Sequence, residues 1–112
     1  MWEDYKMEGR KDDQEKIMTH LYPVDALLET CEVLTYGAKK YEPRNWEKGF
    51  EWSRAYGAAL RHLFAFWQGE DLDPETGISH LAHAACEVAF LQSFHLREIG
   101  KDDRPCGYTL SQ

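Results

Sequence analysis

The apolar positions after Pro23 recur at intervals of three and four residues up to about Lys40. This spacing places them on one face of an amphipathic helix. Pro43 cannot continue such a helix, and residues 41–51 hold Pro, Asn and Gly close together, so we expect a loop there. The apolar face of this first predicted helix consists of Val24, Leu27, Leu28, Cys31 and Leu34.

Two further helices are predicted, over about residues 53–68 and 73–98. Gly69 fits the position that ends the second helix. For the third we expect Asp73 as the N-cap, Pro74 as the first helical residue and Gly100 beyond the end. No strand alternation and no internal repeat occurs in the sequence. The broad apolar stripe of the second helix consists of Tyr56, Leu60, Leu63, Phe64 and Trp67.

These patterns predict one all-α domain over residues 1–112, a bundle of three main helices. Residues 1–20 are charged with little apolar periodicity, so we expect an arm there, and residues 101–112 form a polar tail. The wide apolar faces, with four Trp, six Tyr and five Phe, exceed what a small three-helix domain covers. We therefore expect a homodimer or homotetramer; an arm folded back over the exposed face is the alternative.

The net charge is −7, from 13 basic and 20 acidic residues, which argues against a nucleic-acid polymer as partner. No apolar signal region and no stretch of membrane-spanning length occurs, so we expect a soluble cytoplasmic protein with no membrane partner. The three cysteines form no Cys-x-x-Cys pair, which speaks against a zinc ribbon or a disulfide framework. Cys31 and Cys86 are expected to be small core residues.

Residues 69–84 (GEDLDPETGISHLAHA) lead from an acid-rich turn into the third predicted helix. His80 and His83 share a helix face, which Glu87 extends four residues later. Most other positions of this helix are apolar, so an ordinary core helix would carry no such polar stripe. We therefore interpret this face as part of a functional site.

Three carboxylates on the first predicted helix, Asp25, Glu29 and Glu32, also share a face. Taken alone, this pattern is typical of a face in contact with solvent. If two antiparallel helices bring it against the histidines, the clustered carboxylates need a divalent cation to offset their repulsion. Carboxylates suit Mg²⁺, whereas imidazoles favour Mn²⁺ or another transition ion.

Arg61 and His62 stand in a part of the second predicted helix whose other residues are small or apolar. An arginine in such a setting needs an anion, which is either a carboxylate of the protein or a phosphate of a ligand. His62 is either a hydrogen-bonded structural residue or a ligand or proton carrier. These alternatives stay open in the sequence.

The segment from 37 to 49 (GAKKYEPRNWEKG) combines basic, aromatic and amide side chains. Cations hold phosphates, an aromatic ring stacks on a base and an amide pairs with a base edge. The alternative is a connecting loop with its tryptophan buried as a plug. Since the chain has no Walker loop and no GxGxxG motif, side chains and metal would have to bind a nucleotide. The candidate substrate-binding residues are Lys39, Lys40, Asn45, Trp46, Lys48 and Arg61.

Four segments resemble, in this order, the phage and prophage dATP/dGTP diphosphohydrolase family: GRKDDQEK, VLTYGAKKYEPRNWEKG, ALRHLFAFWQGEDLDPETGISHLAHAA and KDDRP, within residues 9–105. The resemblance implies a MazG-like, all-α, oligomeric nucleoside triphosphate pyrophosphatase that uses Mg²⁺ or Mn²⁺. It also implies hydrolysis of dGTP or dATP to the monophosphate and pyrophosphate, in phage nucleotide-pool control. In phages that replace adenine with 2-aminoadenine, family members resemble the enzyme that supplies dGMP.

The resemblance also implies a metal-ligand set, because the wider superfamily carries Glu-x-x-Glu on one helix and Glu-x-x-Asp on a later one. His80 and His83 match the second motif. Glu29 and Glu32, or the segment around Arg61 and His62, match the first. If Glu29 and Glu32 are not ligands, the acids come from Glu70, Asp73, Glu75 or Glu87.

The resulting prediction names six metal ligands: Glu29, Glu32, Asp73, Glu75, His80 and His83. It names four catalytic residues: Glu29, Glu32, Arg61 and His62. A non-catalytic helical oligomer that binds a nucleotide or metal is the alternative function. A metal-dependent phosphatase that releases inorganic phosphate is a third.

Overall fold

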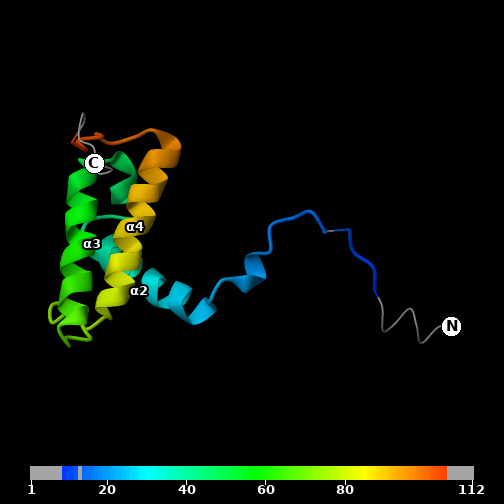
Figure 1. Cartoon of the computed structure of the whole chain (residues 1–112), viewed down its shortest axis with the longest axis horizontal. Helices are drawn as coiled ribbons and strands as arrows, with labels where there is room; N and C mark the ends of the chain where they lie inside the picture. Colours follow the sequence, from blue (N-terminus) through cyan, green and yellow to red (C-terminus); the bar gives the residue numbers. More distant parts are fainter. Residues whose placement is uncertain (1–8, 13, 106–112) are drawn as a thin grey trace, which may run out of the picture.

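The computed structural model describes residues 9–12 and 14–105, in which three long helices form (Figure 1). These helices are α2 (Val24–Lys40), α3 (Trp52–Trp67) and α4 (His80–Arg97), and two short 3₁₀ helices, η1 (Thr19–Leu21) and η2 (Asn45–Lys48), accompany them. No strand forms within these residues, only the isolated bridges Glu51–Lys101 and Leu72–Ser79. The all-α fold with three main helices is therefore confirmed, while the MazG-like arrangement and the oligomeric state stay predictions.

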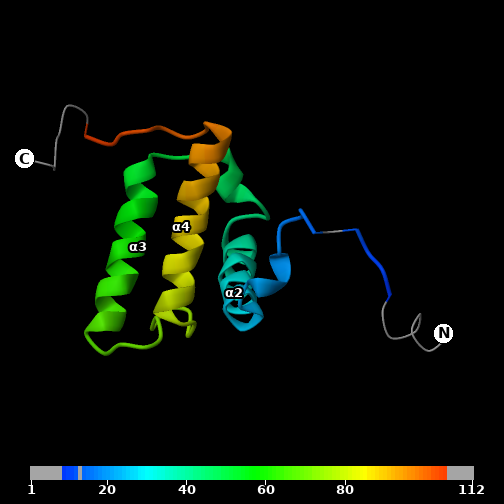
Figure 2. The ribbon, with the colours of Figure 1, turned by 45° about the vertical axis from the view of Figure 1, so that its right-hand side comes forward.

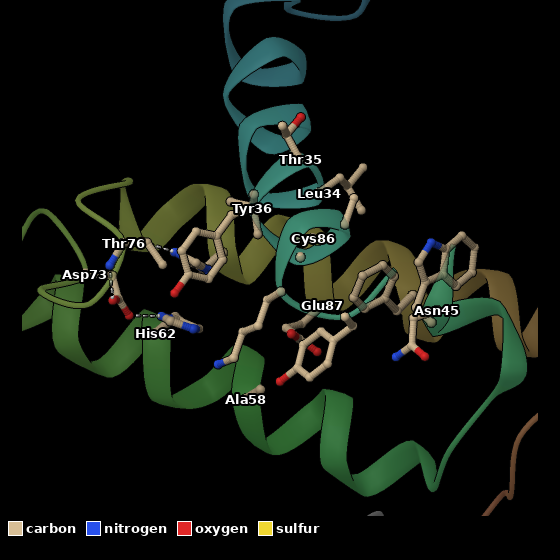
Figure 3. A pocket seen from close by; sticks show the side chains of 18 of the residues that line it. Leu34, Thr35, Tyr36, Asn45, Ala58, His62, Asp73, Thr76, Cys86 and Glu87 are labelled. Carbon is tan, nitrogen blue, oxygen red and sulfur yellow. Dashed lines mark hydrogen bonds and ion pairs between the residues drawn. The ribbon is translucent and has the colours of Figure 1, made fainter. Parts of the chain in front are cut away.

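α3 and α4 run antiparallel and side by side, joined by the turn over residues 68–79 (Figures 1 and 2). α2 packs against α4 and crosses the pair at a steep angle (Figure 3). The described part of the predicted arm leads away from the three helices and does not fold back over them (Figure 1). Residues 1–8, residue 13 and the tail from 106 onward, with Cys106, lie outside the described residues.

The core lies between α3 and α4 and is built largely from small residues. α3 contributes Trp52, Ala55 and Ala59, and small alanines let the two helices approach closely. Phe94 is fully buried on α4, where its ring meets the edge of Phe50 at 5.0 Å between centroids. α2 contributes no buried residue, so the core is mainly a two-helix contact that α2 covers from outside.

α4 begins at His80, six residues after Pro74, the predicted first residue of this helix. The N-cap is Ser79, whose Oγ accepts a hydrogen bond from the backbone N–H of Leu81 at 3.1 Å. Asp73 instead caps a turn, because its Oδ1 accepts from the backbone N–H groups of Glu75 and Thr76. Gly77 then takes a φ of +72°, which ends the turn before a helix can start.

The segment after α4 is tied to the start of α3 (Figure 2). Trp52 donates its indole N–H to the carbonyl of Ile99 at 3.0 Å, and Asp103 accepts from the backbone N–H of Ser53 at 2.9 Å. The backbones of Gly49 and Gly100 approach so closely that a Cβ on Gly49 would lie 2.8 Å from the Gly100 nitrogen. Residues 99–104 therefore act as a distant cap on α3.

Large apolar side chains remain exposed on the helices, as the wide stripes in the sequence indicated. Trp67 is 87% exposed, and Phe64 on the same helix is 60% exposed. Cys86 is buried, as expected, but Cys31 is exposed on α2, from which no residue is buried, so its assignment to the core was wrong. In the part of the chain that the structure describes, no helix combines the length and apolar character of a membrane span.

Candidate active site

A groove of about 1330 Å³ runs between the second half of α2, the loop that follows it, α3 and α4 (Figure 3). Its size exceeds the roughly 300–1,000 Å³ typical of small-molecule pockets, so a ligand as large as a nucleotide fits. Histidines and acids line one end and aromatic rings the other. The two ends are described separately because their chemistry differs.

The histidine end joins three segments of the chain. His62 on α3 places its Nδ1 2.9 Å from Nδ1 of His80, and 3.8 Å from Oδ2 of Asp73 in the turn. The ring of His62 also stacks on that of His83, with 4.6 Å between centroids. Nε2 of His83 lies 2.7 Å from Oγ1 of Thr76. Two helices and the turn between them thus converge on a compact polar cluster.

His80 is buried behind this cluster and is held by Glu70. Its Nε2 lies 2.7 Å from Oε1 of Glu70, and a carboxylate can only accept a hydrogen bond. Nε2 therefore carries the proton in that contact, which leaves Nδ1 facing His62. This is the arrangement by which a second carboxylate fixes the tautomer and orientation of a metal-binding histidine.

His62, Asp73 and His80 offer donor atoms that all lie within 4.8 Å of one another. Two donors that each lie about 2.1 Å from one ion are at most about 4.2 Å apart, so the distances of 2.9 and 3.8 Å fit ligands of a single ion. Two imidazoles with one carboxylate suit a transition ion better than Mg²⁺. The residues present therefore fit a divalent transition ion.

The protonation states at this end also suit metal binding. Burial, together with the charge of His83, lowers the pKa of His62, and burial lowers the pKa of His83. For Asp73, burial acts to raise the pKa, but hydrogen bonds from the Glu75 and Thr76 backbone outweigh it and the net pKa is lowered. Near neutral pH His62 and His83 are therefore neutral and Asp73 is ionised, the forms that bind metals.

Glu75 faces α2 rather than the cluster of His62, Asp73 and His80. Its Oε2 accepts a hydrogen bond from the hydroxyl of Tyr36 at 3.0 Å and lies 3.4 Å from Nζ of Lys40. The Glu75 carboxylate raises the pKa of Lys40, which stays protonated. The Lys40 ammonium is therefore held over the groove, close to the histidine end.

Arg61 of α3 and Glu87 of α4 both line the groove. Arg61 is exposed and makes no hydrogen bond or ion pair with any residue that the structure describes, so its guanidinium is available to an anion. Glu87 is half-buried, and burial raises its pKa to about 7 although Arg61 acts to lower it. A cation and a near-neutral acid therefore line the same stretch of the groove.

The aromatic end is built around Trp46. Its ring stacks on Phe90 of α4, with 5.0 Å between centroids and 21° between planes, and the guanidinium of Arg97 lies 5.2 Å from the ring centre. Glu47 accepts hydrogen bonds from Arg44 and Arg97, which secures this loop against α4. These contacts favour the anchored-loop interpretation of Trp46, and base stacking stays a prediction.

The structure brings most of the predicted site residues to this groove; four lie away from it, and His80 is buried behind its lining. Glu29 and Glu32 are exposed on α2 and do not line it, so their ligand and catalytic roles stay predictions. Lys39 is exposed and also does not line the groove, and Lys48 forms an ion pair with Glu42. The predicted residues that line the groove or its buried wall are Lys40, Asn45, Trp46, Arg61, His62, Asp73, Glu75, His80 and His83.

Two polar contacts at the groove were not predicted. Tyr36 of α2 contacts Glu75 in the acid-rich turn, and Thr76 in the same turn contacts His83 of α4. The first contact joins segments that are far apart in the sequence, and the second depends on how the turn lies against α4. Tyr36 lies next to the basic segment from 37 to 49, which is the one signal that could have drawn attention to it. Thr76 follows Asp73 by three residues, the spacing of a capped turn.

Comparison of the sequence with known proteins identifies a family to which the chain is similar. The family described as "dATP/dGTP diphosphohydrolase, N-terminal" matches residues 6–104. A protein of Salmonella phage PMBT28 named "dATP/dGTP diphosphohydrolase" is 36% identical over 98 residues, which cover 88% of this chain. Those residues cover 33% of the phage protein, so the chain spans about one third of that relative's length. No solved structure matches the chain.

Proposed function

The chain belongs to the family of N-terminal dATP/dGTP diphosphohydrolase domains, and from this premise we propose that it hydrolyses a purine deoxynucleoside triphosphate. The products would be the monophosphate and pyrophosphate, and the reaction would serve phage nucleotide-pool control. The observation that carries the proposal is the convergence of His62, Asp73 and His80 at one end of a groove of nucleotide size.

Under this proposal His62, Asp73 and His80 hold the metal, with Glu70 fixing the orientation of His80. A divalent ion, Mn²⁺ or Mg²⁺, would supply neutralisation of the phosphate charge and a more acidic bound water. Glu29, Glu32, Glu75 and His83 stay candidate ligands from the sequence prediction. Glu29 and Glu32 need a rearrangement or another subunit to reach this end, because neither lines the groove.

The cations of the groove have a separate role. Arg61 and Lys40 line it from α3 and α2, and their positive charges would offset the negative charge that shifts onto the leaving pyrophosphate. Asn45 would offer its amide to the base from the loop that Trp46 anchors. Because phosphoryl transfer depends on positioning and charge stabilisation, the site needs no covalent nucleophile.

The proposal is tested by chromatography of the products after incubation of the purified protein with each common nucleoside and deoxynucleoside triphosphate, with Mn²⁺ or Mg²⁺. Monophosphate and pyrophosphate from dGTP or dATP are expected. Release of inorganic phosphate would instead support the phosphatase alternative. No turnover, despite a rise in melting temperature with nucleotide, would support the binding-protein alternative.

A further inference from the structure

Four carboxylates line the groove, and three of them are already paired within the protein. Glu42 pairs with Lys48, Asp73 accepts two backbone N–H groups, and Glu75 accepts from Tyr36. Glu87 makes no hydrogen bond or ion pair with any residue in the described ranges. In the described residues every fully buried side-chain oxygen has a hydrogen-bond partner. The oxygens of Glu87 have none, so they are not fully buried and are accessible from the groove that Glu87 lines. A half-buried acid without a protein partner is one that a ligand can satisfy.

The position of Glu87 on α4 puts this acid between the two ends of the groove. His83 precedes it by four residues and Phe90 follows by three, so all three share one helix face. At 1.5 Å per residue, the face from His83 to Phe90 extends about 10 Å. Figure 3 shows Glu87 between His62 on one side and Asn45 on the other. A nucleotide with its phosphates at the histidine end would bring its base past Glu87.

We propose that Glu87 recognises the Watson–Crick edge of the purine base, and this proposal rests on the proposed function. Guanine presents two adjacent donors there, N1–H and the 2-amino group, and the two oxygens of a carboxylate accept both. The two donors of guanine and the two acceptors of a carboxylate form a bidentate pair, which fixes the base as well as binding it. Pyrimidines offer no such pair of donors.

The same side chain also accommodates adenine when it is protonated. Adenine offers a donor at its 6-amino group and an acceptor at N1, which match the carbonyl oxygen and the O–H of a carboxylic acid. Burial raises the pKa of Glu87 to about 7, so both forms are present near neutral pH. The charged and titratable groups that line the same groove include Arg61 and His62 of α3, Lys40 of α2 and His83 of α4, and of these the charge of Arg61 acts to lower the pKa of Glu87. One residue therefore provides a match for either purine.

Glu87→Gln tests the proposal, because an amide keeps the shape but presents one donor and one acceptor. Steady-state kcat/KM is measured for dGTP, dATP and dITP, whose base lacks the 2-amino group. We expect kcat/KM for dGTP to fall roughly 10- to 100-fold relative to dATP in the variant. In the wild-type protein dITP should be a poorer substrate than dGTP, and in Glu87→Gln this difference should disappear.

Glu42→Gln is the matched control, since it makes the same change at a groove carboxylate that already pairs with Lys48. It should leave the dGTP to dATP ratio at the wild-type value. Equal losses on both purines in Glu87→Gln would place the residue at the sugar or the metal and overturn the proposal, as would an unchanged ratio. Melting curves confirm that each variant is folded.

The failure of the proposed function gives a different result. If the wild-type protein turns over no nucleotide, the hydrolase proposal fails, and calorimetric Kd values for dGTP and dATP then take the place of kcat/KM. A preferential loss of dGTP affinity in Glu87→Gln would still support recognition of the base edge. Equal affinities, or no binding of either nucleotide, would overturn it.

Discussion

The burial of Glu87 leads to a prediction about the stability of the folded protein, which can be tested without a substrate. Burial raises the pKa of Glu87 from an ordinary 4.5 to about 7 in the folded protein. Between these two values the folded state therefore binds more protons than the unfolded state. Its stability falls as the pH rises through this window, and the full cost of the buried charge is present above about pH 7.

The size of the effect follows from the same numbers. The rise from 4.5 to about 7 corresponds to about 3 kcal/mol at about 1.4 kcal/mol per pKa unit. Since the side chain is only half-buried, solvent screening reduces this to about 1–2 kcal/mol. Glu87→Gln removes the titrating group, so the variant should match the wild-type protein near pH 4.5 and be more stable by about 1–2 kcal/mol at pH 8.

Urea unfolding followed by circular dichroism measures this difference at a series of pH values from 4.5 to 8, with chelator present and at one protein concentration. Glu42→Gln serves again as the control, and its difference from wild type should not follow the same pH course. A Glu87→Gln difference that stays constant with pH, or that favours the wild-type protein at pH 8, would refute the reasoning.

Four further predictions concern other parts of the molecule. Glu70→Gln should weaken Mn²⁺ binding about 10- to 100-fold by calorimetry, because His80 loses the carboxylate that orients it; unchanged affinity would remove His80 from the site. Trp46→Ala should lower the free energy of unfolding by about 2–4 kcal/mol through lost contacts with Phe90 and Arg97, whereas a stable variant with only a raised KM would favour base stacking. Asp103→Ala should cost about 0.5–2 kcal/mol in the same assay, since it removes the cap on Ser53; no change would mean that residues 99–104 do not support α3. The dGTP to dATP ratio of kcat/KM should rise between pH 6 and 8 as Glu87 ionises and should stay flat in Glu87→Gln.

The limits of a helix could be predicted where the local sequence has only one structural interpretation. Pro23 precedes α2 directly, and the predicted limits of this helix agree with Val24–Lys40. The start of α4 could not be placed in the same way, because Asp73 and Pro74 fit a helix start as well as a turn. Gly77 decides between the two, and its positive φ becomes evident only in the structure.

The sequence allowed us to predict most of the residues that form the candidate site, but not which of them lie together in the structure. The face of His80 and His83 was identified from the sequence, and the segment of Arg61 and His62 was one of two alternatives for its partner; α3 and α4 do meet there. The contact of His80 with His62, rather than with the acids of α2, depends on how α2 crosses the bundle. Periodicity does not encode that crossing, and for the same reason the contact of Tyr36 with Glu75 was not predicted.

The central claim is that this groove hydrolyses purine deoxynucleoside triphosphates with the help of His62, Asp73 and His80. It is tested most directly by comparing the wild-type protein with His62→Ala in one product assay, with dGTP or dATP and Mn²⁺. We expect the wild-type protein to form the monophosphate and pyrophosphate, and a folded His62→Ala variant to form neither above background. Equal rates for the two proteins, or inorganic phosphate from the wild-type protein, would contradict the account.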